Sequence, residues 1–229
     1  MLADKDRMLG AVGHDLRTPL ASLRVRVEQV DDDRLREKMI ASIEEMTAML
    51  ADILALARSG AGTEAPEAIA LPLLLRELTA DYGEQGKDVA AGALAEAAVR
   101  ARPMLLRRVL RNLIDNARSF SAPDGVVRVS LGRQKGQALI IVDDDGPGIP
   151  HENLESIFER FYTSRPKGTA FGGNSGLGLS IVRQIILAHG GAVRAENRPS
   201  PSAAGDAPSA EAGDIAGARF TVVLPEARR

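Results

Sequence analysis

Residues 126–150 read VVRVSLGRQKGQALIIVDDDGPGIP, and this stretch decides the fold class. Val126–Leu131 and Ala138–Val142 are short apolar runs rich in β-branched side chains, and the turn-forming residues GRQKGQ separate them. The pattern predicts two antiparallel strands that lead directly into a turn with three consecutive aspartates.

Helical patterns flank this strand pair on both sides. Pro103–Phe120 predicts a helix with proline in its first turn, and Leu177–His189 predicts another that Gly190-Gly191 would end. The other expected elements are a helix over Leu73–Tyr82 and strands over Val193–Glu196 and Phe220–Leu224. Together they predict an α+β sandwich with helices on one face of a mixed sheet.

Between the last two strands, about residues 198–217 read RPSPSAAGDAPSAEAGDIAG. Segments so poor in large apolar side chains cannot offset the entropy of being ordered. We therefore expect a flexible surface insertion without chemistry, and a partner-binding loop is the alternative.

The amino-terminal residues 1–59 have a different pattern, that of a helical hairpin. Apolar side chains recur there with the 4-3 spacing of a coiled-coil seam. They are Leu9, Leu16, Leu20, Leu23, Val27 and Val30 and, after the possible cap Asp31–Asp33, Met39, Ile43, Met46, Leu50, Ile53 and Ala57. Two helices with one stripe each cannot enclose a core, so a homodimer with a four-helix bundle is predicted.

Composition bounds the remaining possibilities. The segment SGAGTEAP predicts a linker over residues 60–66, ahead of a second domain at 67–229. The chain has 45% hydrophobic and 26% charged residues and no cysteine, which excludes fibrous, disordered and disulfide-stapled classes. A net charge of −2 disfavours nucleic acid as a partner. No apolar run approaches the roughly 20 residues of a membrane helix, so a soluble chain is expected.

The first segment with chemical potential is HDLRTPL, residues 14–20. His14 lies off the apolar seam, Thr18 follows one helical turn later, and Pro19 is expected to bend the helix because it cannot bond the Asp15 carbonyl. Neutral imidazole is a competent nucleophile near pH 7, and the adjacent carboxylate can take up its proton. Taken alone, His14 could also be a solvated side chain.

Two asparagines, Asn112 and Asn116, lie four residues apart in the predicted helix 103–120. Amide carbonyls can ligate Mg²⁺ without adding negative charge beside a triphosphate. Four arginines, Arg107, Arg108, Arg111 and Arg118, surround the pair with positive charge. The alternative is that both amides face solvent.

Two glycine-containing turns complete the set of candidates. Asp144, at a strand end, could accept a hydrogen bond from an adenine amino group, and Gly146 and Gly148 would allow close backbone approach. Gly172–Leu179, GGNSGLGL, opens a helix whose first N–H groups could bind phosphate. Each could also be an ordinary turn, and the second fits neither the dinucleotide fingerprint nor the P-loop.

Taken together and in order, these segments resemble the catalytic core of sensor histidine kinases. HDLRTPL resembles the phosphoacceptor motif, while NLIDNA, DDGPGI, FERFY (residues 158–162) and GLGL match the N, G1, F and G2 boxes of the histidine-kinase ATPase domain. The resemblance covers nearly the whole chain and implies a dimeric phosphotransfer hairpin, residues 1–59, followed by an ATP-binding α/β sandwich.

The resemblance also implies roles for individual residues. His14 would be phosphorylated, Asp15 would act as general base, and Thr18 would position water in a phosphatase reaction. In the implied nucleotide site, Asn116 binds Mg²⁺, Asn112 lies near the metal or phosphates, and Asp144 binds adenine in a pocket shaped by Gly146 and Gly148. Gly176 and Gly178 would face the phosphates, and Gly173, Ser175 and Leu177 are further cofactor-binding residues. Residues 163–175 would be the mobile ATP lid, with Phe158 and Phe161 as its anchors and Arg165 or Lys167 reaching the γ-phosphate. Ser119 and Asn174 depart from the family pattern, which expects Lys and Gly there.

The implied activity is ATP-dependent autophosphorylation of His14, then transfer to an aspartate of a response-regulator receiver domain. The implied location is the cytoplasm, where the chain could be part of an inner-membrane receptor. Two rivals stay open: a non-catalytic scaffold that sequesters regulators, and an ATP-driven clamp related to gyrase and Hsp90. Intact His14, Asn116 and Asp144 disfavour the scaffold, and the HDLRTPL hairpin has no place in the clamp.

Overall fold

The computed structural model describes residues 2–58, 64–122, 124–160, 162, 176–199 and 215–227. The chain divides into two compact units. One consists of residues 1–63, which contain a helical pair, together with residues 159–181, and the other, residues 64–158 and 182–229, is called the α/β unit. Within the described residues, no helix combines the length and the apolar composition needed to cross a bilayer.

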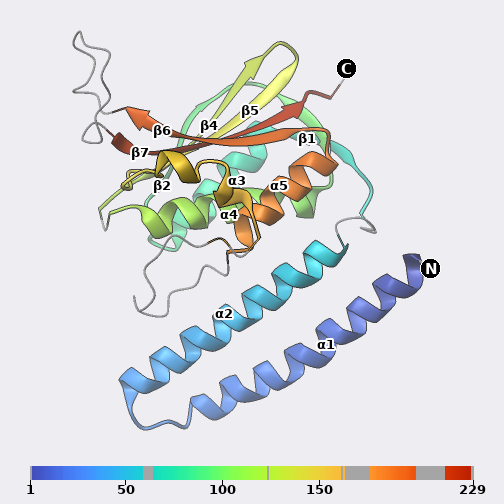
Figure 1. Cartoon of the computed structure of the whole chain (residues 1–229), viewed down its shortest axis with the longest axis vertical. Helices are drawn as coiled ribbons and strands as arrows, with labels where there is room; N and C mark the ends of the chain where they lie inside the picture. Colours follow the sequence, from blue (N-terminus) through green and yellow to red (C-terminus); the bar gives the residue numbers. More distant parts are fainter. Residues whose placement is uncertain are drawn as a thin grey trace. The chain divides into compact units, whose positions relative to one another are not determined.

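The helical pair consists of α1 (Leu2–Val27) and α2 (Asp33–Arg58), which pack side by side (Figure 1). The predicted cap forms at the start of α2, where the Leu35 N–H donates to Asp32 Oδ1 at 3.0 Å. The predicted hairpin is confirmed, and Pro19 lies inside α1.

The seam of this hairpin is only partly covered by the chain itself. Val27 and Ile43 are buried, but Leu16 and Leu23 each remain 45% exposed. Met39 and Met46 on α2 are also exposed. The pair therefore has an apolar stripe that its own two helices leave in water.

Within the described residues, the α/β unit contains two sheets, the helices α3 and α4, most of α5, and the short 3-10 helices η1 (His151–Asn153) and η2 (Ser156–Phe158). Its elements are β1 (Glu67–Ala70), α3 (Leu71–Glu84), β2 (Val89–Leu94), β3 (Ala98–Ala101), α4 (Pro103–Phe120), β4 (Val127–Gln134), β5 (Gln137–Asp143), α5 (Gly178–Ala188), β6 (Ala192–Pro199) and β7 (Ile215–Pro225). The main sheet has the order β2-β4-β5-β7-β6, with β2 parallel to β4 and every other pair antiparallel. Helices α3, α4 and α5 lie on one face of it (Figure 1), which confirms the predicted mixed sandwich.

The core lies between this sheet and the helices, and each layer contributes fully buried aliphatic side chains. Leu75 and Leu78 come from α3, and Leu110 and Ile114 come from α4. On the sheet side of the core, Val222 of β7 is fully buried as well. Burial of such side chains is the main stabilising term of a domain of this kind.

The turn between β4 and β5 is shorter than GRQKGQ suggested. Only Lys135 and Gly136 connect the strands, and both have left-handed φ, 51° and 75°. Two consecutive left-handed residues form the turn that matches the twist of a tight hairpin, so the strands extend to Gln134 and Gln137.

The predicted insertion at about 198–217 is a second difference, because strands occupy both of its ends. β6 extends to Pro199 and β7 begins at Ile215, with Arg198 paired to Gly217. Backbone pairing thus overrides the composition at these positions. Residues 200–214 lie outside the described residues.

Candidate functional site

Asn112 and Asn116 are half-buried on α4, beside the apolar stripe that Leu113 and Ala117 bury against the sheet. Polar contacts between α3 and α4 fix the rotation of this helix. The Tyr82 hydroxyl donates to Asp115 Oδ1 at 2.8 Å, and burial together with this carboxylate raises the pKa of Tyr82. The α3–α4 ion pairs are Glu77 with Arg107 and Asp81 with Arg111.

The amino terminus of α4 has no capping side chain of its own, and two distant residues serve instead. His189 Nε2 accepts from the Arg102 N–H at 3.1 Å, and both carboxylate oxygens of Glu64 lie 3.1 Å from the Met104 nitrogen. Glu64, which lies in the predicted linker, thus contacts the first turn of α4. These contacts satisfy N–H groups that have no partner within the helix.

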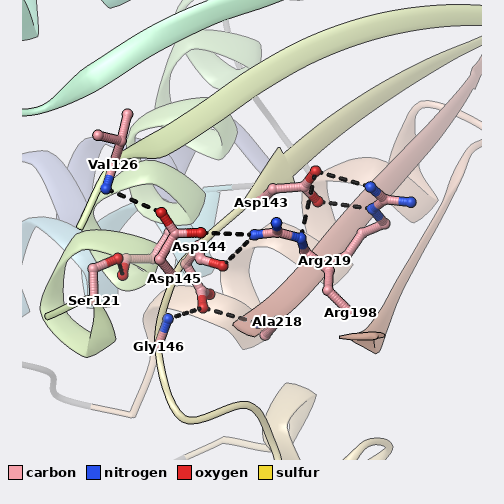
Figure 2. Close-up of polar contacts among 10 residues, drawn as sticks. Ser121, Val126, Asp143, Asp144, Asp145, Gly146, Arg198, Ala218 and Arg219 are labelled. Carbon is pink, nitrogen blue, oxygen red and sulfur yellow. Dashed lines mark hydrogen bonds and ion pairs between the residues drawn. The ribbon is translucent and has the colours of Figure 1, made fainter. Parts of the chain in front are cut away.

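Asp144 is the most deeply buried carboxylate of the site, at 2% exposure. Its Oδ1 accepts from the N–H groups of Gly146, at 3.0 Å, and Ala218, at 2.9 Å (Figure 2). Burial raises the pKa of Asp144, while these bonds and the nearby Arg198 oppose that shift. A carboxylate held in this way suits recognition of a buried donor group.

The turn after Asp144 packs against the carboxyl end of α4. A Cβ on Gly146 would lie 2.7 Å from the Phe120 carbonyl oxygen, so only glycine permits this approach. Gly148 has a φ of +77°, which favours glycine as well. Asn116 lies one helical turn before Phe120, so the structure brings Asp144, Gly146 and Asn116 to the same end of α4, whereas Gly148 lies against Asn197 and Ile215.

The glycine-rich segment leads into α5, which begins at Gly178. Leu177 is buried, and its carbonyl oxygen accepts from the Ile181 N–H at 2.9 Å and the Ser180 hydroxyl at 2.8 Å. Gly176 precedes it with a φ of +67°. The first N–H groups of such a helix point out of its amino end, where an anion can bind.

The remaining predicted residues fall into three groups. Phe158 is buried and packs edge-on against Phe220, with ring centroids 6.5 Å apart. Asp15 and Thr18 are exposed on α1, the helix that also contains His14. Five predicted residues lie outside the described part of the chain: Phe161, Arg165, Lys167, Gly173 and Ser175.

Sequence reasoning missed the residues of β6 and β7 that contact the Asp144 turn. Asn197 binds Ile149, Arg198 binds Asp144 and Asp145, and Arg219 binds Asp143. A signal was present, since three consecutive aspartates require nearby cations, but the sequence does not indicate which arginines supply them.

Comparisons with known proteins agree with this arrangement. Residues 4–62 match the model of the His Kinase A (phospho-acceptor) domain, and residues 101–228 match that of the histidine kinase-, DNA gyrase B- and HSP90-like ATPase family. The sensor protein ChvG of Agrobacterium fabrum is 38% identical over 237 aligned positions, covering 94% of this chain and 38% of that protein. The sensor histidine kinase GtrS of Pseudomonas aeruginosa is 36% identical, covering 86% and 40%.

Solved structures give the same result. The mycobacterial sensor histidine kinase MprB is 30% identical, with a TM-score of 0.57 over 72% of this chain and 100% of that one. Full-length ShkA in complex with AMPPNP shares the fold, with a TM-score of 0.72 at 24% identity, over 97% of this chain and 46% of that one. The chain spans about two fifths of the length of the curated relatives it matches. It therefore belongs to the histidine kinase-, DNA gyrase B- and HSP90-like ATPase family, and with a phospho-acceptor domain ahead of the ATPase domain it has the catalytic core of a sensor histidine kinase.

Proposed function

We propose that this chain transfers the γ-phosphoryl group of ATP to His14 and then to an aspartate of a response-regulator receiver domain. The observation that carries the proposal is the buried Asp144, held by backbone N–H groups next to the end of α4. A nucleotide site of this kind, in a chain that also contains a phospho-acceptor domain, supports phosphoryl transfer to histidine.

In the proposed nucleotide complex, Asp144 accepts a hydrogen bond from the adenine amino group, and Gly146 and Gly148 line the base. The backbone at Gly176, Leu177 and Gly178 binds phosphate. From outside the described residues, Gly173 and Ser175 join the phosphate site, Phe161 helps Phe158 to anchor the lid, and Arg165 or Lys167 reaches the γ-phosphate.

The residues of α4 fit a Mg²⁺ ion, because Asn116 offers a half-buried neutral oxygen donor. We assign the metal to Asn116, with Asn112 close to the metal or the phosphates. Bound Mg²⁺ would supply charge neutralisation at the phosphates, where the reaction needs positioning and electrostatics more than covalent chemistry from the protein.

On the hairpin, an imidazole nitrogen of His14 would attack the γ-phosphorus. The N–P bond forms, the bond from phosphorus to the ADP oxygen breaks, and Asp15 takes up the imidazole proton. Thr18 would position water in a phosphatase reaction. This role is supported by relatives that are named histidine-protein kinase/phosphatase MprB.

We further propose a homodimer, because Leu16, Leu23, Met39 and Met46 leave an apolar stripe on the hairpin exposed. The proposed domains are residues 1–59 for the hairpin, 60–66 for the linker and 67–229 for the ATP-binding domain. We assign the chain to the cytoplasm, where it could be part of an inner-membrane receptor.

Incubation with γ-labelled ATP and Mg²⁺ tests the proposal against its rivals. We expect an acid-labile, alkali-stable phosphoprotein that is lost in His14→Gln and in Asn116→Ala. An ATP-driven clamp would release phosphate without retaining label, and a scaffold would do neither. An unchanged thermal melt of Asn116→Ala is the control that its α/β unit is folded, and the hairpin dimer should also be retained.

A further inference from the structure

Two consecutive residues of β6, Asn197 and Arg198, hold the turn that carries Asp144, and we call them the β6 clasp. Arg198 Nη1 donates to the Asp144 carbonyl oxygen at 2.6 Å and to Asp145 Oδ1 at 3.0 Å (Figure 2). The Arg198 side chain is only 19% exposed. One nitrogen thus ties a backbone oxygen to a neighbouring carboxylate.

Asn197 holds the other end of the same turn. Its Oδ1 accepts from the Ile149 N–H at 2.7 Å, and its Nδ2 donates to the Ile149 carbonyl oxygen at 2.7 Å. A side-chain amide that bonds both backbone groups of one residue fixes that residue's peptide planes as well as its position. The β6 clasp therefore holds the turn 144–149 at both of its ends.

The charges of this turn also depend on the clasp. Asp143, Asp144 and Asp145 are consecutive, so three carboxyl groups lie close together on this turn and repel one another when charged. Arg219 forms a two-point ion pair with Asp143, at 2.7 and 2.9 Å, and Arg198 Nε lies 4.0 Å from Asp143 Oδ2 (Figure 2). Arg198 is thus placed between the charges of all three aspartates.

Strand β7, which pairs with β6, lies against the Asp144 backbone at Gly217. Gly217 pairs with Arg198 and has a φ of +138°, and a Cβ there would lie 1.9 Å from the Asp144 carbonyl oxygen. The carbonyl therefore has room only because residue 217 is glycine. The backbone of Asp144 is confined by β7 and bonded by β6.

We propose that the β6 clasp is a positioning device for base recognition: it fixes the Asp144 backbone so that the carboxylate faces the amino group of adenine. Both hydrogen bonds that the described residues make to this carboxylate use Oδ1, which leaves Oδ2 for the base. The inference rests on the proposed function, since it assumes that Asp144 contacts adenine. Guanine carries a carbonyl where adenine carries this amino group, so the clasp contributes to the choice of ATP over GTP.

The test is the ratio of ATP to GTP affinity, measured by calorimetry on the full 229-residue chain. Arg198→Ala is expected to weaken ATP binding about tenfold and GTP binding by no more than about twofold, since misorienting Asp144 affects only the base that it recognises. Arg198→Lys should fall between, because an ammonium lacks the planar fork of the guanidinium. Arg194→Ala, an exposed arginine of the same strand, should change neither affinity.

Equal losses for both nucleotides, or an unchanged ratio in Arg198→Ala, would overturn the positioning role. Should Arg198→Ala fail to fold, Asn197→Asp provides the second arm. It removes the bond to the Ile149 carbonyl and should also lower the ratio, and an unchanged ratio there counts equally against the clasp. Asp144→Ala distinguishes a failure of the proposed function from a failure of the β6 clasp. Undiminished ATP binding in Asp144→Ala would refute the proposed function. Weak ATP binding in Asp144→Ala, together with an unchanged ATP-to-GTP affinity ratio in Arg198→Ala, would refute the clasp alone.

Discussion

The helical pair and the α/β unit differ in how completely they bury their apolar side chains. In the α/β unit, Leu75, Ile114 and Val222 are fully buried within the unit itself. In the helical pair, Leu16 and Leu23 remain 45% exposed. The α/β unit has a complete core, whereas the helical pair leaves part of its apolar seam in water, which the proposed homodimer would cover. Substitutions in the two units should therefore affect different measurements.

The largest effect is expected for Phe220→Ala in the α/β unit. Phe220 is buried and packs edge-on against Phe158, and truncation of such a ring costs about 3–5 kcal/mol of unfolding free energy. Chemical denaturation measures this loss of unfolding free energy, and a separate titration measures ATP binding. Sedimentation should still show the hairpin dimer. If the dimer dissociated together with nucleotide binding, the two units would not be independent.

Gly217→Ala should come next, with a cost of about 2 kcal/mol from the strained φ and the collision with Asp144. ATP affinity should fall with it, because the Asp144 backbone must move. Gly132→Ala is the matched control, since a Cβ at this glycine of β4 meets nothing within 4 Å. Thermal melts and ATP titration of the two variants give the comparison, and equal behaviour would contradict the crowding at Gly217.

Leu23→Ala tests the other side of the comparison. Its exposed side chain would be covered only in the dimer, so truncation should weaken dimerisation by on the order of 1 kcal/mol per chain. ATP affinity should not change. Val25→Ala, more exposed and off the seam, serves as the control. Analytical ultracentrifugation measures both, and an unaltered dimer in Leu23→Ala would argue against this seam as the interface.

The smallest effect on stability, and one of opposite sign, is expected for Asp144→Asn. Burial raises the pKa of Asp144 in the folded chain, so its ionised form is disfavoured by folding. Its contribution to stability is therefore greatest below the ordinary aspartate pKa of about 3.9 and is lost as pH rises through the folded value. Asp144→Asn should remove this dependence and leave the nucleotide-free melting temperature near pH 7 unchanged or slightly higher, while ATP binding is lost. A clearly lower melting temperature would contradict the sign.

Local sequence signals predicted much of the fold. The helix expected at Pro103–Phe120 has those bounds, because proline opens it and its apolar face is continuous. Gly190 and Gly191 end α5 as expected, with a left-handed Gly190 and a bond from the Gly191 N–H to the Ile186 carbonyl. Strands β1, β2 and β3 were not predicted, because their alanine-rich sequences have weak strand propensity and depend on their partners.

The residues of the candidate site also differ in whether local sequence signals could identify them. Asp144, Gly146 and Gly148 could be identified because they are contiguous and their chemistry is local. The β6 clasp could not, since Arg198 and Asp144 are 54 positions apart and only the order of strands brings them together. Composition near residue 198 even suggested an insertion without structure. Long-range pairing, which a single sequence does not reveal, decided this part of the site.

The most direct test of the central claim is to locate the phosphoryl group after incubation with ATP and Mg²⁺. Peptide mapping under alkaline conditions, which preserve phosphohistidine, should find it on the peptide that contains His14, and Asp144→Ala should abolish it. A phosphoryl group on any other residue, or none at all in a chain that binds ATP, would contradict transfer from the α/β unit to the hairpin.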